Sequence, residues 1–170
     1  MRNFRPLFLG ILLVGTLAAA LSAVDRPLVL YNHTPSLPLG WYAVTTTPGA
    51  GEAVAVFPVP SRVQALVAER RWLPDGAFLS KPVGAQAGDH VCIRDRRIYV
   101  NGTDFGAVQA SDSEGRPMPT VDYCGAVPDG YFWALIAGRS DSFDSRYIGA
   151  IDTHSIVGYA RALWTWPASS

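Results

Sequence analysis

Lysine, cysteine and histidine are scarce in this 170-residue sequence, and charges of one sign never form a run. Its 14 basic residues balance 14 acidic ones, so the chain lacks the clustered positive charge by which proteins bind nucleic acids. We therefore exclude nucleic acid as a partner. Lys81 is the single lysine. Because arginine stays charged at any working pH, Lys81 is the one amine side chain that burial could neutralise and convert into a base.

The few cysteines and histidines exclude further kinds of catalytic centre. Cys92 and Cys124 lie far apart in the sequence and have no adjacent His or Cys, which is a poor pattern for a metal site. His33, His90 and His154 are scattered, and they show no Ser-His-Asp order that competes with a lysine base. We therefore predict neither a metal nor any other cofactor.

The N-terminal part of the chain is typical of a membrane segment. Residues 7–24 are 18 uncharged, mostly apolar residues, near the lower limit for a helix that crosses a bilayer. Two arginines within residues 1–6 place that end in the cytoplasm by the positive-inside rule, and residues 25–170 outside it. The alternative is a cleaved signal peptide with a small-x-small site at Ala20-Leu21-Ser22. We favour the uncleaved anchor, and both alternatives deliver the domain to the same compartment.

The chain beyond residue 24 has room for one domain of about 145 residues with a sizeable core. Outside the cytoplasm the surroundings are oxidising, which allows Cys92 and Cys124 to pair. The loop that this bond closes would stabilise the domain by roughly 3–4 kcal/mol in the chain-entropy description. Two buried free thiols are the alternative.

Short β-branched and aromatic runs separated by turn residues predict a mostly antiparallel β domain with seven or eight strands. The strands are expected at residues 41–46, 52–57, 77–83, 90–93, 97–103, 130–136, near 151 and at 156–160. Asn101-Gly102 gives the strongest hairpin signal. One helix of about ten residues is expected after Ser61 as its N-cap, because Val63, Leu66 and Val67 follow at helical spacing.

The turn at residues 32–42 presents a serine between two prolines, just after the apolar segment. Pro35 and Pro38 restrict the backbone around Ser36, and Gly40 permits a sharp exit from the turn. A rigid turn can present a hydroxyl for chemistry, although Ser and Pro are also the common residues of ordinary loops. The hydroxyl needs a catalytic partner elsewhere in the chain. It is not a penicillin-recognising site, since the third residue after Ser36 is Leu39 where such enzymes have lysine.

Lys81 is the candidate partner. It lies in the predicted strand 77–83 among apolar residues, and Pro82 follows it. Burial lowers the pKa of a lysine and can turn an inert cation into a general base. The alternative is a lysine that reaches the surface from an edge strand.

The segment at residues 138–149 alternates charges with hydroxyls, as a solvated loop with a local Asp-Arg pair would. Together with three earlier blocks it resembles the type I signal peptidases, which are membrane-anchored Ser-Lys peptidases. These blocks are the Ser36 turn, the strand at 52–57 and residues 81–91. The resemblance runs from about Leu7 to Leu163.

Within that family, one subgroup is most similar. The pattern Asn32-x-Thr34-x-Ser36-x-Pro38-x-Gly40-x-Tyr42, the short helix before the lysine strand and the small size resemble the conjugative-transfer (TraF-type) peptidases. That subgroup processes pilin precursors in bacterial conjugation. The resemblance implies a signal-peptidase-like (LexA/signal peptidase) antiparallel β fold with one short helix, preceded by an N-terminal transmembrane helix.

The resemblance also implies roles for individual residues. Ser36 corresponds to the nucleophile and Lys81 to its general base, while Thr34 and the Ser36 backbone N–H correspond to the oxyanion hole. Ser142 matches a hydroxyl that orients the lysine amine. The structural ion pair of the family is matched by Asp144 and Arg146. Departures from the family pattern, such as Pro82 and the run 83–88, flank the lysine and bear on substrate details more than on catalysis.

The expected substrate is a precursor protein, pilin or another signal-peptide-bearing protein, cut after small residues. The expected location is the outer face of a bacterial inner membrane, with the bilayer itself as a partner and the catalytic domain in the periplasm. Some conjugation peptidases also cyclise the pilin, and the sequence leaves this open. Two alternatives are a catalytically silent, membrane-tethered β domain of a secretion assembly and a self-cleaving Ser-Lys repressor. The repressor is disfavoured by the apolar N-terminus and by the absence of a helix-turn-helix region before Ser36.

Overall fold

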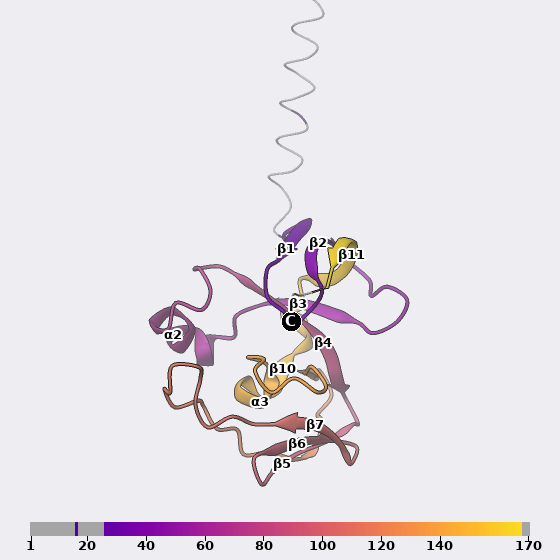
Figure 1. Ribbon diagram of the computed structural model, residues 1–170. Coiled ribbons are helices and arrows are strands. Elements are labelled where there is room, and N and C mark those ends of the chain that lie inside the picture. The colour runs from indigo at the N-terminus through magenta and orange to yellow at the C-terminus, as the bar shows by residue number, and fades with distance from the viewer. Residues whose placement is uncertain (1–15, 17–25, 168–170) are drawn as a thin grey trace, which may run out of the picture.

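The computed structural model describes Thr16 and residues 26–167, which form two antiparallel β-sheets (Figure 1). The expected membrane segment, residues 7–24, lies outside the described residues apart from Thr16, and so do residues 1–6. Within the described part of the chain, no helix has the length and apolar character needed to span a membrane. The prediction of a mostly antiparallel β domain is confirmed.

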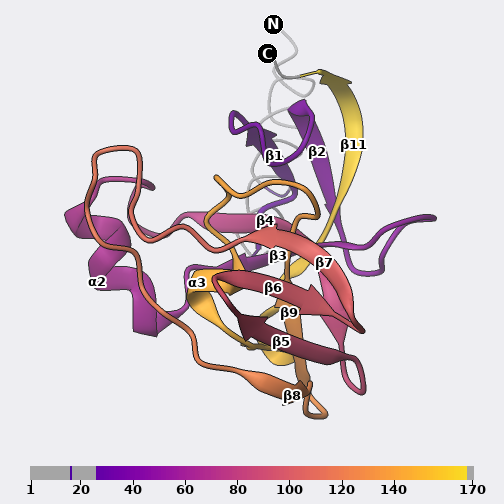
Figure 2. The same ribbon diagram turned by 60° about the horizontal axis from the view of Figure 1, so that its bottom comes forward.

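The larger sheet has seven strands in the order β1-β2-β11-β3-β4-β9-β10. Its strands are β1 (Val29–Asn32), β2 (Leu39–Thr45), β3 (Val54–Pro58), β4 (Phe78–Gln86), β9 (Tyr131–Ala134), β10 (Ile151–Asp152) and β11 (Gly158–Trp166). The smaller sheet has four strands in the order β7-β6-β5-β8, and Figure 2 brings it to the front of the molecule. Its strands are β5 (His90–Arg94), β6 (Arg97–Val100), β7 (Thr103–Ala107) and β8 (Cys124–Ala126).

The described helical segments are α2 (Ser61–Glu69), α3 (Ser145–Ile148) and the single 3-10 turn η1 (Thr153–Ser155). The prediction of a short helix before the lysine strand is confirmed, and Val63 and Val67, one turn apart, form its buried face. The prediction that Ser61 is the N-cap is wrong. An N-cap residue needs a non-helical backbone, which Pro60 supplies with ψ 138°, so Ser61 is already the first helical residue.

Strand β9 separates two hydrophobic cores. Phe132 faces the core under α2, where its ring meets Phe57 edge to face with the centroids 5.6 Å apart. The next residue, Trp133, faces the second core, against Val91 and Ile98 of the smaller sheet. This alternation of neighbouring side chains places the two cores on opposite faces of the larger sheet at β9, with the smaller sheet on the side of Trp133.

The described strands include the predicted hairpin and outnumber those predicted. The hairpin at Asn101-Gly102 is confirmed, since both residues have the positive φ of a type I′ turn between β6 and β7. The described residues contain eleven strands, where seven or eight were predicted. The additional ones include β1 and the three-residue β8, which are too short or too irregular to show a period-two pattern.

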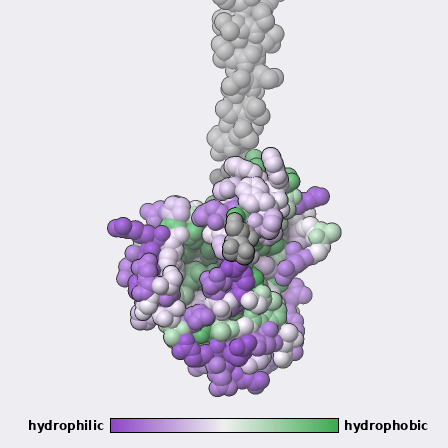
Figure 3. All heavy atoms as spheres, in the orientation of Figure 1, coloured by the Kyte–Doolittle hydropathy of each residue, from purple (hydrophilic) through white to green (hydrophobic). Residues whose placement is uncertain are grey.

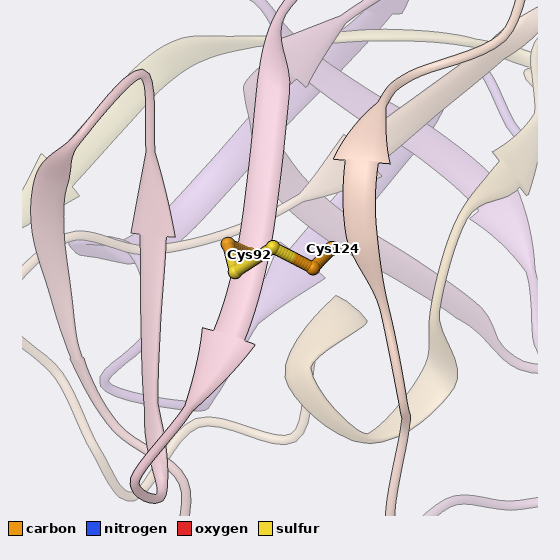
Figure 4. The surroundings of a disulfide bond; sticks show 2 residues. All are labelled: Cys92 and Cys124. Carbon is orange, nitrogen blue, oxygen red and sulfur yellow. A yellow bond between two sulfur atoms is a disulfide. The ribbon is translucent and has the colours of Figure 1, made fainter.

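The two cysteines join the strands of the smaller sheet. Cys92 on β5 and Cys124 on β8 lie directly opposite each other in the antiparallel register and form a disulfide (Figure 4). The described part of the chain contains no free cysteine. The structure therefore has the paired form and not the alternative with two free thiols.

Candidate active site

A cavity of about 820 Å³ is lined by segments that are distant in sequence. They are the turn after β1, the first half of β4, the chain after α2, the loop at 109–118 and the segment before α3. Figure 3 shows a hollow on one face of the molecule, with apolar residues inside it. The cavity brings together four of the predicted site residues, Thr34, Ser36, Lys81 and Ser142.

The turn that carries Ser36 is closed by the side chain of Asn32, the last residue of β1. The Asn32 Nδ2 group donates to three backbone oxygens of the turn, those of Thr34 at 2.8 Å, Leu37 at 3.0 Å and Pro38 at 3.1 Å. One amide group thus satisfies carbonyl oxygens that a tight turn leaves without partners. The prolines restrict the turn, and Asn32 holds its two ends together.

The same contacts fix the direction of the hydrogen bonds around Ser36. Because Asn32 Nδ2 faces the carbonyl oxygens, Asn32 Oδ1 accepts from the backbone N–H of Thr34 at 3.3 Å and from its hydroxyl at 3.0 Å. A threonine hydroxyl has one proton, so Thr34 Oγ1 accepts from Ser36 Oγ, which lies 2.9 Å away. In this arrangement the Ser36 proton points at Thr34, and the Thr34 proton points towards Asn32.

Lys81 lies in an internal strand, paired with Ala55 of β3, and its side chain is only 7% exposed. Its Nζ donates to Ser142 Oγ at 2.9 Å. The pKa of the Lys81 amine is lowered from 10.5 to about 8, mainly by burial; the charge of Asp144 opposes this fall, and the positive charge of Arg139 adds to it. The lysine does not reach the surface from an edge strand.

The Asp144-Arg146 ion pair is buried, and neither side chain is exposed to solvent. Asp144 is the N-cap of α3, and its Oδ1 accepts from the backbone N–H of Arg146 at 3.1 Å and from Arg146 Nε at 2.8 Å. The rest of the guanidinium donates to the backbone oxygens of Ala107, Ile136 and Arg139. Burial raises the pKa of the Asp144 carboxyl, and the guanidinium opposes this rise. The expectation of a solvated loop at residues 138–149 is therefore wrong for this pair.

Arg139 connects the two halves of the site. Its Nη1 donates to the backbone oxygen of Pro35 at 2.8 Å, next to Ser36, and its other nitrogens bind Asp141 at 2.6 and 3.0 Å. The sequence analysis missed this role, because the contact joins residues 104 positions apart and no local pattern indicates it.

The described hydrogen bonds do not join Ser36 directly to Lys81. The Ser36 hydroxyl binds Thr34, and the Lys81 amine binds Ser142, although both residues line the same cavity. No group of three or more His, Cys, Asp or Glu side chains in the described ranges could hold a metal ion. The site thus offers a hydroxyl, a weakly basic amine and backbone donors.

Comparisons with known proteins point to one family. The family described as signal peptidase, peptidase S26, matches residues 1–166. The Escherichia coli plasmid transfer protein TraF is 30% identical over 145 residues, covering 79% of this chain and 82% of that protein. The Agrobacterium fabrum conjugal transfer protein TraF is 35% identical over 146 residues, covering 79% and 81%. The Sinorhizobium fredii probable conjugal transfer protein TraF is 34% identical over 181 residues, covering 97% and 93%.

Among solved structures, a signal peptidase I from Enterococcus faecalis is similar with a TM-score of 0.36 and 22% identity, covering 66% of this chain and 98% of that chain. The family match spans nearly the whole sequence, and the three conjugal transfer proteins align over most of their own length. The chain therefore belongs to the signal peptidase family, peptidase S26, alongside relatives of the TraF type.

Proposed function

We propose that this protein is a membrane-anchored serine endopeptidase that processes precursor proteins, with Ser36 as nucleophile and Lys81 as general base. The observation that carries the proposal is the one cavity that both residues line, in a chain that belongs to the signal peptidase family. A lysine with a pKa of about 8 holds a usable neutral fraction near neutral pH, which an ordinary surface lysine lacks.

The first chemical step is acylation of Ser36. The neutral Lys81 amine takes the Ser36 proton while Ser36 Oγ attacks the carbonyl carbon of the scissile peptide bond. Lys81 then gives that proton to the leaving amine, the C–N bond breaks and an acyl-enzyme remains. Water, activated by the same amine, releases the acyl group. Ser142 keeps the amine in place through the 2.9 Å hydrogen bond.

Two donors would stabilise the oxyanion of this reaction, the backbone N–H of Ser36 and the hydroxyl of Thr34. Each such donor contributes about 3 kcal/mol in other enzymes. In the arrangement described here, Thr34 donates to Asn32 and accepts from Ser36. Rotation of the Ser36 hydroxyl towards Lys81 removes that bond, and Thr34 must then turn its proton from Asn32 to the substrate oxygen. Substrate binding would therefore require the Ser36 and Thr34 hydroxyl groups to rotate together.

The family and the sequence support a proposal for the substrate and the location. The relatives are named as plasmid and conjugal transfer proteins, which supports a pilin precursor cut after small residues as the substrate. Residues 7–24 would anchor the chain in the inner membrane, residues 1–6 would lie in the cytoplasm and the domain at 25–170 would face the periplasm. The acyl-enzyme can pass to water, or to the amino group of the same substrate to give a cyclic pilin.

The test is mass spectrometry of a candidate pilin precursor, and in parallel of a precursor with a generic Ala-x-Ala signal peptide. Each is co-expressed with the wild type, Ser36→Ala, Lys81→Arg or Ser61→Ala. Ser36→Ala lacks the hydroxyl nucleophile, and in Lys81→Arg the arginine cannot act as a base, so both variants should lose processing. Ser61→Ala removes an exposed serine at the start of α2, and this variant should still process the precursor.

Loss of a terminal segment with only the wild type and Ser61→Ala would support the proposed mechanism. A pilin product lighter than its linear fragment by one water would show cyclisation. Normal processing by Ser36→Ala or Lys81→Arg would refute the assignment. If none of the four proteins changes either precursor, the result counts against the peptidase function and favours the silent binding domain.

A further inference from the structure

The cavity extends beyond the polar groups of the proposed chemistry into an apolar part. This part, the aromatic subsite, is formed by Trp72, Met118, Phe143 and Tyr147. The Trp72 and Phe143 rings lie with their centroids 4.9 Å apart, and the Phe143 and Tyr147 rings are stacked at 6.1 Å. Three separate segments thus supply one apolar wall, namely the chain after α2, the loop at 109–118 and the segment that enters α3.

The wall of the aromatic subsite is fixed by Arg70. The guanidinium lies 5.1 Å from the Trp72 ring, in cation-π geometry. Its Nη1 also donates to Asp112 Oδ2 at 3.1 Å and contacts Met118 Sδ at 3.5 Å. The side chains of Arg70 and Asp112 are each 8% exposed, and Arg116 binds Asp112 as well. The loop is therefore held against the end of α2, and the Asp112 carboxylate that lines the cavity is neutralised by two arginines.

The aromatic subsite begins next to the proposed base. Phe143 directly follows Ser142, whose hydroxyl accepts from Lys81 Nζ. A peptide whose scissile bond lies between Ser36 and Lys81 would therefore place a nearby side chain against Phe143. Alanine-sized side chains fill little of a cavity of about 820 Å³, so small residues at the cleavage point leave this apolar part empty.

We propose that the aromatic subsite binds one bulky apolar side chain of the precursor, such as Leu, Met or Phe. This inference rests on the proposed peptidase function and deepens it, because the enzyme then recognises a large residue as well as the small ones at the cleavage point. Acidic side chains are disfavoured, since the subsite presents aromatic faces and the arginines beside it are already paired with Asp112. Burial of such a side chain is expected to raise kcat/KM about 10- to 100-fold over serine at the same position.

The experiment uses the full-length protein in detergent micelles and internally quenched peptides that contain an Ala-x-Ala cleavage sequence. One flanking position at a time carries serine, glutamate or leucine, and kcat/KM is measured for each peptide. We expect a leucine-to-serine ratio of about 10 to 100 at one flanking position and no gain with glutamate. In Trp72→Ala and in Met118→Ala the ratio should fall to about 3 or less, because the wall that contacts leucine is removed.

The matched control is Trp164→Ala, which removes a tryptophan of β11 that is 73% exposed and does not line the cavity. Its ratio should equal that of the wild type. The ratio cancels any general loss of activity, and circular dichroism verifies that each variant is folded. Equal rates with serine and leucine at every position, or a ratio unchanged in both subsite variants, would overturn the subsite. Failure of the wild type to cleave any peptide would instead count against the proposed peptidase function.

Discussion

The Lys81 amine is buried without a carboxylate at hydrogen-bond distance. Its partner among the described residues is the neutral hydroxyl of Ser142, and Asp144 acts on it only through space. A buried ammonium is therefore costly. This cost lowers the pKa of the amine, so that its neutral form is available as a base near neutral pH. The same property that would suit Lys81 to the proposed role of general base must reduce the stability of the fold.

This cost predicts a pH-dependent stability difference between the wild type and Lys81→Met. The fall of the pKa from 10.5 in the unfolded chain to about 8 corresponds to about 3 kcal/mol. Below pH 8 both states bind the proton and the folded state bears the full cost, which disappears as pH rises from 8 to 10.5. We therefore expect Lys81→Met to be more stable than the wild type at pH 7 and to lose this advantage by about pH 10.5.

The measurement is chemical unfolding of both full-length proteins in detergent at a series of pH values. Titrating tyrosines affect the two proteins alike, so the difference between their free energies of unfolding isolates the lysine. Parallel curves at all pH values would contradict a buried lysine with a lowered pKa.

Arg139 carries a second prediction at this scale, because it acts on the site in two ways. Its charge helps to lower the pKa of Lys81, after the larger effect of burial, and its Nη1 holds the backbone oxygen of Pro35. In the proposed mechanism kcat/KM rises with pH as Lys81 loses its proton. Arg139→Gln removes a positive charge and should raise the pKa of Lys81, which shifts this rise to higher pH. Arg139→Lys should keep the pH of the rise and lower the plateau, since lysine cannot bind Asp141 and Pro35 at once. Identical pH profiles in Arg139→Gln and the wild type would refute this.

At the scale of elements, the four-residue helix α3 depends on the buried Asp144-Arg146 pair. Asp144→Ala leaves a buried guanidinium uncompensated and removes the N-cap, so we expect a loss of about 3–5 kcal/mol in the free energy of unfolding. The measurement is denaturant unfolding of the full-length protein. The double variant Asp144→Ala with Arg146→Met should recover part of this loss, because no unpaired charge is then buried.

The matched control for this pair is Asp104→Ala, which breaks the Arg97-Asp104 ion pair on the smaller sheet. Both side chains of that pair are more than 40% exposed, so its loss should change stability little. Equal losses in Asp144→Ala and Asp104→Ala would mean that the buried pair has no special role in holding α3.

The elements also show which parts of this fold the sequence could predict. Period-two patterns and Asn101-Gly102 indicated the β6-β7 hairpin, and helical spacing indicated α2, because these signals are local. Helix α3 was missed, since four residues are too few for a periodic signal and its stability comes from a buried ion pair. The Ser61 cap was wrong because Pro60 occupies that backbone position.

The residues of the candidate site also divide into those that the sequence could predict and those that it could not. Residue types and spacing, with the family resemblance, indicated residues such as Ser36, Lys81 and Ser142, which the fold places around one cavity. Asn32 was quoted as part of a pattern, but its contacts with three backbone oxygens depend on the conformation of the turn. Arg139 and Trp72 could not be predicted, because their partners come from segments that only the tertiary fold brings near.

At the scale of the whole molecule, the polar groups of the site lie outside the ring that the disulfide closes, whereas the aromatic subsite takes one of its four residues, Met118, from inside that ring. Ser36 and Lys81 precede Cys92, and Ser142 follows Cys124. The loop at 109–118, which supplies Asp112 and Met118, lies between the two cysteines.

In the proposed function, the disulfide would therefore constrain substrate choice more directly than bond cleavage. Oxidation closes a ring that contains the loop at 109–118, which limits how far that wall can move from Trp72 and the end of α2. Reduction would release the ring and leave the turn of Ser36 and strand β4 outside the change. A reduced enzyme would then keep its hydrolytic chemistry and accept a wider range of precursors. The redox state of the compartment would set the selectivity of the protein, and its turnover would follow the pH.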